Sequence, residues 1–182
     1  TLYALNLESL ESRKLYNAPE GYNEGLGMVG ADGKYIYGTL TEDLSKKIYT
    51  NLSASYIGMR DFFYAKPNCK IVQLDAETGK SEIIWQENCW IGHVNPSPTQ
   101  AHLMTFCHEG PWNLVDHRIW GLDLHNGTPY KLREREVEEE KIGHEYWHQD
   151  GLHVGYQVHR PEGGSRFGMV KYDGTEQEEA PC

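Results

Sequence analysis

GHVNPSPTQAHLMTFC (residues 92–107) and GHEYWHQDGLHVGYQV (residues 143–158) begin alike, and their shared pattern decides the fold. Each has a Gly-His pair, a short run of alternating apolar and polar residues, a turn, and a second alternating run. Alternation with a period of two indicates a strand with one buried face, and the Ser-Pro and Asp-Gly turns predict hairpins. A related stretch at residues 25–40, GLGMVGADGKYIYGTL, keeps the Asp-Gly turn without the histidine.

A second phrase alternates with this hairpin along the chain. It is an alternating run that reaches an acid or amide and then a turn, and it occurs as LYALNLESLESRKLY (2–16), KIVQLDAETGKSEIIW (70–85), RIWGLDLHNGTPYKL (118–132) and FGMVKYDGTEQEE (167–179). Together the two phrases give four strands per repeat of roughly fifty residues, which is typical of a β-propeller blade. An all-β propeller is therefore the predicted fold, with a β-sandwich of accidental internal similarity as the alternative.

The chain forms one predicted domain, which the repeat divides into about three to four blades. We expect a blade end at about 1–20, a blade at about 21–88, a blade at about 89–140 and a partial blade at about 141–182. Residues 41–67 exceed the repeat and predict an insertion above one face, where long loops often form sites. Because a propeller needs typically four to eight blades to close, we expect this chain to be part of a longer protein.

The composition excludes two classes of partner. The chain has 27 acidic and 17 basic residues and a formal net charge of −10, which argues against nucleic-acid binding. No apolar run is long enough to span a membrane, so no membrane partner is expected either. The four cysteines form no CxxC pair, a pattern that suits a reducing compartment: Cys69, Cys89, Cys107 and Cys182.

The two Gly-His pairs predict where His93 and His144 lie. Each pair stands at the beginning of a blade's first strand, the strand that lines the central channel of a propeller. Both histidines are expected to face the channel, where a structural role and a role in a site both remain open. HEYWH (144–148) is not a self-contained zinc site, because residues i and i+4 of a strand lie roughly 13 Å apart.

The densest group of polar residues is FCHEGPWNLVDHRIW (106–120). A hairpin with a polar tip explains its glycine and proline. It does not explain Arg118, a long cation at the beginning of a strand, which needs a partner or a ligand. The rigid fork of an arginine is suited to binding a carboxylate.

Three stretches carry a resemblance to a known family. CHEGPWNLVDHRIW (107–120), GHEYWHQDG (143–151) and FFYAKPNCKIVQLDAETGKSEIIWQENCWIGH (62–93) resemble the oligogalacturonate lyases of polysaccharide lyase family 22. The likeness runs along the whole chain in order and includes the insertion. It implies a seven-bladed propeller and a bacterial, cytoplasmic enzyme of pectin degradation.

The resemblance also implies the reaction and the residues that perform it. Family members cleave short, often unsaturated oligogalacturonides by β-elimination to 5-keto-4-deoxyuronate and use a divalent cation, usually Mn²⁺. The family's proposed base falls on His144, and its proposed catalytic arginine falls on Arg118. His108, within the same motif, and His93, by its position, are the candidate substrate-binding residues.

The implied chemistry agrees with these residue types. Elimination removes the C5 proton, which is weakly acidic while the adjacent carboxylate stays charged, so a cation must hold that carboxylate. A metal ion does this as a Lewis acid, and Arg118 could share the work. A neutral imidazole, with a usual pKa of about 6.5, is a workable base near neutral pH.

The chain departs from the family pattern at the metal. The family's ligands are three histidines and a glutamine, and the first follows a stretch like PACSH, whereas this chain ends in EEAPC at Cys182. The resemblance places every metal ligand after Cys182, so none is assigned here. We expect this chain alone to be inactive or poorly active. The competing function is a non-catalytic, TolB-like propeller that binds carbohydrate or protein.

Overall fold

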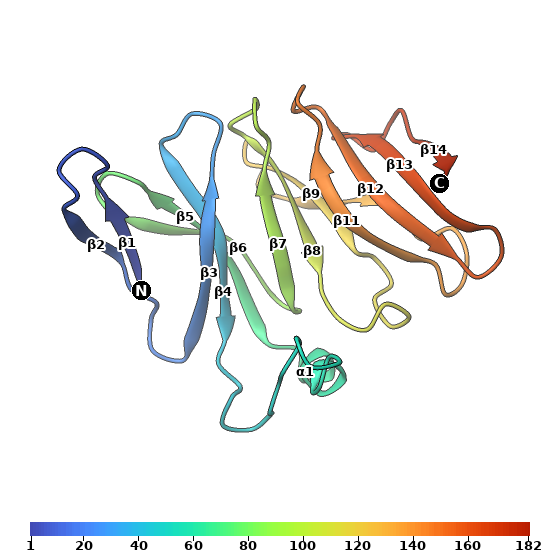
Figure 1. Ribbon diagram of the computed structural model, residues 1–182, viewed down its shortest axis with the longest axis horizontal. Helices are drawn as coiled ribbons and strands as arrows, with labels where there is room; N and C mark the ends of the chain where they lie inside the picture. Colours follow the sequence, from blue (N-terminus) through green and yellow to red (C-terminus); the bar gives the residue numbers. More distant parts are fainter.

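The computed structural model describes residues 1–182 as antiparallel sheets placed side by side, with one short helix (Figure 1). The first sheet is β1 (Leu2–Leu5) and β2 (Ser12–Tyr16); the second is β3 (Tyr22–Val29), β4 (Tyr35–Glu42), β5 (Asn68–Asp75) and β6 (Ser81–Asn88); the third is β7 (Ile91–Pro96), β8 (Leu103–His108), β9 (Ile119–Asp123) and β10 (Pro129–Arg133); the fourth is β11 (Lys141–Trp147), β12 (His153–Arg160), β13 (Gly164–Lys171) and β14 (Glu178–Pro181).

Within each sheet every strand pairs with the next strand in the sequence, which is the topology of a propeller blade. The ring is not closed, so the chain is a partial all-β propeller, as expected. The structure differs at residues 141–182, which were expected to form a partial blade. They form four strands, because the acidic segment Glu178–Pro181 pairs with β13 although it has no alternating apolar pattern.

The insertion lies between β4 and β5 and contains the helix α1 (Met59–Ala65). The sequence predicted the insertion but gave no sign of this helix, since seven residues are too few to show a period of 3.6. Gly58, with φ of 76°, precedes the helix, and a side chain at this position would meet the carbonyl oxygen of Tyr49. No helix in the structure has the length and apolarity needed to cross a bilayer.

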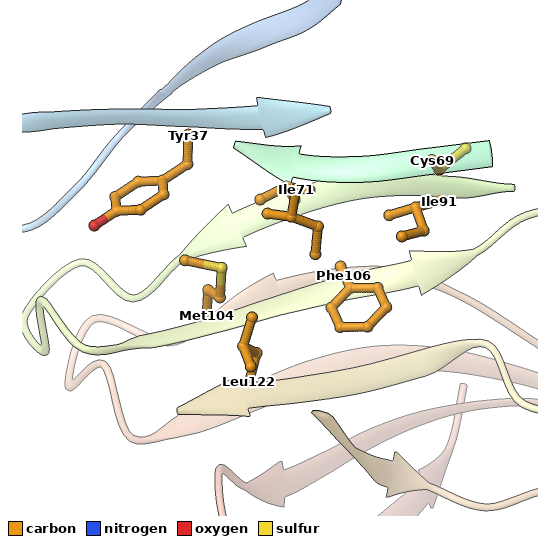
Figure 2. Packing of buried hydrophobic residues seen from close by; sticks show 8 residues of the cluster. Tyr37, Cys69, Ile71, Ile91, Met104, Phe106 and Leu122 are labelled. Atoms are coloured by element: carbon orange, nitrogen blue, oxygen red, sulfur yellow. The ribbon is translucent and has the colours of Figure 1, made fainter. Parts of the chain in front are cut away.

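The main core lies between the second and third sheets (Figure 2). Its buried members are Tyr37, Cys69 and Ile71 from one sheet and Ile91, Val94, Met104, Phe106 and Leu122 from the other. Burying one large apolar side chain contributes about 1.5–3 kcal/mol, so this cluster holds the two sheets together. It therefore fixes β7, the strand that carries His93, against the sheet below the insertion.

The third and fourth sheets are joined by a second core, in which Ile119 and Leu132 pack against Ile142 and its neighbours, and by two turns. The hydroxyl groups of Ser97 and Thr99 donate hydrogen bonds of 2.8 Å to the carbonyl oxygens of Gly151 and Asp150. The indole of Trp147 donates a 2.9 Å hydrogen bond to the carbonyl oxygen of Asn95. These contacts set the position of β11 against β7, and with it the position of His144 relative to His93.

A buried ionic cluster ties β10 to the last sheet. The Arg133 guanidinium is fully buried and lies 3.1 Å from a Glu140 oxygen and 2.8 Å from a Glu179 oxygen. Arg160 reaches the same two carboxylates at 2.8 and 3.0 Å. Every member is paired, as buried charges must be, so this cluster is accounted for as a structural element.

All four cysteines are free.

Candidate active site

The two Gly-His pairs form the same backbone feature. In β7 the register shifts by one residue between Gly92 and Asn95, and in β11 it shifts by one residue between Gly143 and Tyr146. Each strand therefore has a β-bulge, a feature that re-aims a side chain. His93 and His144 sit at these bulges with φ of 47° and 54°, in the left-handed region that few residues other than glycine adopt. Such strain costs of order 1–3 kcal/mol and clusters at functional sites.

The glycine of each pair leaves room for a side chain of the site. A Cβ on Gly92 would lie 2.6 Å from Glu109 Oε1, and a Cβ on Gly143 would lie 2.8 Å from the ring of Trp112. The same Cβ on Gly143 would be 3.5 Å from Arg118 Nε. The recurring Gly-His pair thus combines a bulged histidine with a glycine against which another side chain of the site packs.

Arg118 is held between two glutamates just before β9. Its Nη1 donates a 2.9 Å hydrogen bond to Glu109 Oε2 and its Nη2 a 3.4 Å hydrogen bond to Glu109 Oε1, while Nε lies 3.5 Å from Glu145 Oε2. The guanidinium also stacks on Trp112, 5.0 Å from the ring centroid. The side chains of Arg118, Glu109 and Glu145 are only 10%, 12% and 1% exposed, so the ion pairs are buried.

Glu145 has a second partner, which is neutral. The Cys107 thiol donates a hydrogen bond to Glu145 Oε1 at 2.7 Å, and both groups are buried. Burial raises the pKa of the Cys107 thiol well above its usual value, with the Glu145 charge acting in the same direction. Cys107 therefore stays protonated and serves as a donor to the carboxylate.

His93 is paired with a carboxylate. Its Nε2 lies 3.1 Å from Glu109 Oε1, and its Nδ1 lies 3.9 Å from Glu145 Oε1. The hydrogen bond with Glu109 raises the pKa of His93 against the opposite effect of burial. Burial would raise the pKa of Glu109, but His93 and Arg118 outweigh it and lower that pKa. The geometry favours an imidazolium at His93.

His144 is paired with a neutral amide instead. Its Nδ1 lies 2.8 Å from Gln157 Oε1, across the β11–β12 pair. The ring is exposed and lines the same cleft as His93 and Arg118. The two histidines share a backbone conformation and a cleft but have partners of different charge.

The cleft that joins these groups has a volume of about 480 Å³ and two contrasting walls. One wall is charged and comes from the third and fourth sheets: His93, Glu109, Arg118, His144 and Glu145. The other is mainly apolar and comes from the insertion and from Trp90, which packs on Phe62 of α1: Leu52, Tyr56, Met59 and Trp90. Trp112 lines the cleft from the charged side, against Arg118. A cleft of this kind fits a ligand with an anionic group on one side and an apolar face on the other.

The structure does not bring His108 to this cleft. Its Nε2 lies 2.7 Å from Glu87 Oε1, and the ring packs on Trp120 in a separate pocket beside α1. The period-two alternation of β8 explains the separation, because Cys107 faces Glu145 and His108 must face the other way. Of the four predicted residues, His93, Arg118 and His144 share one cleft.

Sequence reasoning had missed four residues that the structure places at the site. Glu109 and Glu145 each follow a motif histidine directly, in HEG and HEY, so an acid next to the histidine was the available signal. Trp112 follows a Gly-Pro turn, and a large apolar residue at the tip of a polar hairpin was the available signal. Gln157 gave no signal, because a single glutamine in an alternating strand is ordinary.

Replacing Gly143 with alanine tests how closely the site is packed. The new methyl group would meet Trp112 at 2.8 Å and push its ring off Arg118. We expect a loss of about 1–3 kcal/mol of unfolding free energy, the usual cost of overpacking. Chemical denaturation measures this, with Gly27→Ala as the control because a Cβ at the bulged residue of β3 meets nothing within 4 Å. Equal stability of the two variants would contradict the packing argument.

The cleft does not gather a set of metal ligands. Three donors that lie within 4.8 Å of one another occur elsewhere, at the turns beyond β7 and β9: His102, Asp123 and His125. In that group the Asp123 carboxylate already accepts the backbone N–H of His125 at 2.9 Å, which is the bond of an ordinary turn. In the cleft, Glu109 and Glu145 are engaged by Arg118. The residues of this chain thus do not form the site that a catalytic manganese ion requires.

Consecutive four-stranded sheets with a charged cleft at the bulges of their first strands define a β-propeller protein with a ligand site at one face. A family model for oligogalacturonate lyase matches residues 1–176. The chain therefore belongs to the oligogalacturonate lyase family.

Individual relatives agree with the family. The chain is 29% identical to the oligogalacturonide lyase of Pectobacterium atrosepticum over 167 residues, which cover 91% of this chain and 42% of that protein. It matches an oligogalacturonate lyase in complex with manganese with a TM-score of 0.85 and 26% identity, over 99% of this chain and 48% of that one. The β-propeller domain of the Trilobed protease from Pyrococcus furiosus shares the fold, with a TM-score of 0.54 and 14% identity over 91% of this chain and 45% of that one. The chain spans less than half the length of these relatives.

Proposed function

We propose that the complete protein cleaves short oligogalacturonides by β-elimination and releases 5-keto-4-deoxyuronate. Membership of the oligogalacturonate lyase family supports this proposal. The observation that carries it is the single cleft that holds His144, Arg118 and His93. A base and two cations in one cleft are the groups that elimination next to a carboxylate requires.

In the proposed reaction His144 is the base. It takes the C5 proton of the uronate, the electron pair of the C5–H bond forms the C4–C5 double bond, and the C4–O bond breaks with its electrons on the leaving oxygen. That oxygen takes a proton from water as the leaving sugar departs, and His144 returns its proton to the solvent. The unsaturated monosaccharide then opens to the 5-keto-4-deoxy form.

Arg118 and His93 are the proposed partners of the uronate carboxylate. Arg118 alone is a weak attractor, because Glu109 already occupies both ends of its fork and Glu145 adds a second negative charge. An imidazolium at His93 restores the balance on the charged wall. The manganese bound by the related structure would add positive charge of the same kind, but this chain does not gather ligands for it. His108 stays a predicted substrate contact that no geometry supports.

The apolar wall is proposed to hold the sugar ring next to the one that reacts. Tyr56 lines the cleft, is 59% exposed and has a left-handed backbone. Sugars present faces of C–H groups, which pack on aromatic rings and apolar side chains. The insertion therefore supplies binding surface while the sheets supply the reacting groups.

Replacing Tyr56 with alanine should weaken binding of the substrate and leave the chemical step intact. An aromatic contact contributes about 0.5–1.5 kcal/mol, which corresponds to roughly a threefold to tenfold rise in KM. We expect kcat to change little, as measured on unsaturated digalacturonate. Tyr49→Ala is the matched control, because Tyr49 is an exposed tyrosine of the same insertion that does not line the cleft. A fall in kcat at constant KM would remove Tyr56 from the binding wall.

The role of His93 predicts a pH dependence of binding. The pKa of His93 is raised above its usual value of 6.5, so the imidazolium persists up to that raised pKa and is lost above it. We expect KM for the anionic substrate to rise as the pH passes upward through this point. In Glu109→Gln the carboxylate partner is gone, so the rise in KM should begin at lower pH. A rise that begins at the same pH in both proteins would show that another group controls it.

The substrate class is tested by comparing charged and neutral disaccharides. We expect the complete protein to turn over unsaturated digalacturonate and to leave the neutral digalactose analogue untouched, since only the uronate acidifies the C5 proton. Binding of digalacturonate without turnover would favour the non-catalytic, carbohydrate-binding alternative. Turnover of the neutral analogue would contradict the proposed mechanism.

We propose a cytoplasmic location for the protein. The support is chemical: the four cysteines are free, and two of them, Cys69 and Cys107, are buried. Free thiols persist in reducing compartments. Cell fractionation tests this, and recovery of the protein in the periplasmic fraction would contradict it.

A further inference from the structure

We propose that Gln157 is a positioning residue that sets the proton arrangement of the His144 ring, placing the proton on Nδ1 and the free lone pair on Nε2. This inference rests on the proposed function of His144 as a base, but it makes a claim about the resting protein that can be tested without substrate. The contact that carries it is the 2.8 Å approach of Gln157 Oε1 to His144 Nδ1.

The chemistry of the two groups gives the direction of the hydrogen bond. A neutral imidazole has one N–H donor and one acceptor nitrogen, and an amide oxygen can only accept. Because Gln157 presents its oxygen, Nδ1 must carry the proton and donate it. Nε2 is then the nitrogen that can take a proton, and a base must present that lone pair to the substrate.

The matched pair of histidines shows why the partner matters. His93 has the same left-handed backbone at the same kind of bulge, but its ring contacts the Glu109 carboxylate. A carboxylate favours the charged form of an imidazole, whereas an amide fixes the tautomer without adding charge. At the strand position of Gln157, β8 has Cys107, whose thiol contacts Glu145 rather than His93. The same backbone feature thus pairs a histidine with a carboxylate in one sheet and with an amide in the next.

The position of Gln157 makes it a defined support. It lies on β12, between β11 and β13, opposite Gly143 and Phe167, and it is half-buried. The other charged or titratable groups around His144 are known from the two pockets that it lines: Glu145, Arg118, Glu109 and His93 in the cleft, and Lys141 and His159 on the other side. The His144 ring itself has Gln157, and no carboxylate, as its side-chain partner.

The direct test is ¹⁵N NMR of the complete protein labelled in its histidine rings. The His144 signals are assigned by their loss in His144→Gln, and the two ring nitrogens are read as protonated or unprotonated at a pH where the ring is neutral. We expect a protonated Nδ1 and an unprotonated Nε2 in the wild type, and a mixture or the reverse in Gln157→Leu. A wild type with the proton on Nε2, or no change in Gln157→Leu, would overturn the proposal.

Kinetics supply the second readout. Gln157→Leu should lower kcat about tenfold with KM nearly unchanged, because a fraction of the rings then present the wrong nitrogen. Gln157→Glu should retain the proton on Nδ1 and move the rising limb of the pH–rate profile to higher pH, since a carboxylate favours the imidazolium. A purely structural role would leave the limb in place, and that result would overturn the positioning role.

The control variant is Gln86→Leu, a glutamine on the exposed outer strand β6 that lines neither pocket of His144. It should match the wild type in both readouts. Failure of the proposed function has a different signature, because His144→Ala would then keep its activity while the NMR tautomer and its dependence on Gln157 remained. The opposite result, in which the wild-type ring does not carry its proton on Nδ1 but His144→Ala still loses activity, would reject only the role of Gln157.

Discussion

His144→Ala should lower kcat of the complete protein by about 10²–10⁴-fold, the usual contribution of a positioned general base. The ring lines the cleft beside Arg118, and its Nδ1 is already engaged by Gln157, so the remaining nitrogen is available to the substrate. The other imidazole that lines the cleft, His93, contacts the Glu109 carboxylate, which favours its charged form. KM should change by much less than kcat. Steady-state kinetics on unsaturated digalacturonate provide the measurement.

The control for His144→Ala is His125→Ala, an exposed histidine at a turn beyond β9. It should retain wild-type kinetics. Alanine also adopts the left-handed backbone of residue 144 less readily than histidine does. His144→Asn is therefore a useful second variant, because asparagine tolerates that conformation but cannot act as a base at neutral pH. Near-normal turnover in His144→Asn would exclude His144 as the base.

Arg118→Ala should have the second large effect, and it should lower both activity and stability. Removing the guanidinium leaves Glu145 buried without a cation and leaves Glu109 with His93 as its remaining partner. Breaking a buried ion pair by deleting one partner costs about 3–5 kcal/mol of unfolding free energy. The substrate carboxylate would also meet two negative charges where a cation had stood, so kcat/KM should fall by orders of magnitude. Chemical denaturation and kinetics measure the two effects.

Two further variants separate the effects of Arg118 on stability and on turnover. Arg118→Ala combined with Glu145→Gln removes one uncompensated charge, so it should recover part of the lost stability without recovering turnover. Arg60→Ala, at an exposed residue of α1, should change neither quantity. If Arg118→Ala keeps both the wild-type free energy of unfolding and the wild-type kcat/KM, Arg118 contributes neither to stability nor to turnover.

Much of the architecture could be predicted from the sequence because its signals are local. Alternation and Asp-Gly turns define hairpins over a few residues, and their recurrence indicates blades. The fourth strand of the last sheet was missed because Glu178–Pro181 has no apolar alternation. Its backbone pairs with β13, and its Glu179 side chain joins the buried cluster of Arg133 and Arg160, a partnership that a local sequence pattern does not reveal. The helix α1 was missed because it is too short to show a period and depends on its surroundings in the insertion.

The placement of the two histidines could be predicted because it follows from their position in the repeat. Their hydrogen-bond partners could not. His93 and His144 were placed together by their equivalent positions, and the structure adds the shared bulge and the left-handed backbone. Their different partners, Glu109 and Gln157, depend on which side chains cross from neighbouring segments, and a repeat does not contain that information. His108 could have been separated from the site by the alternation of β8, since Cys107 occupies the face that contacts Glu145.

The central claim is that this cleft performs elimination on a uronate, and analysis of the products tests it most directly. The complete protein is incubated with unsaturated digalacturonate, and the products are weighed by mass spectrometry. Elimination predicts two molecules of 5-keto-4-deoxyuronate whose masses sum to that of the substrate, with none formed by His144→Ala. Products that have gained one water molecule, as in hydrolysis, or equal product formation by His144→Ala, would contradict the account.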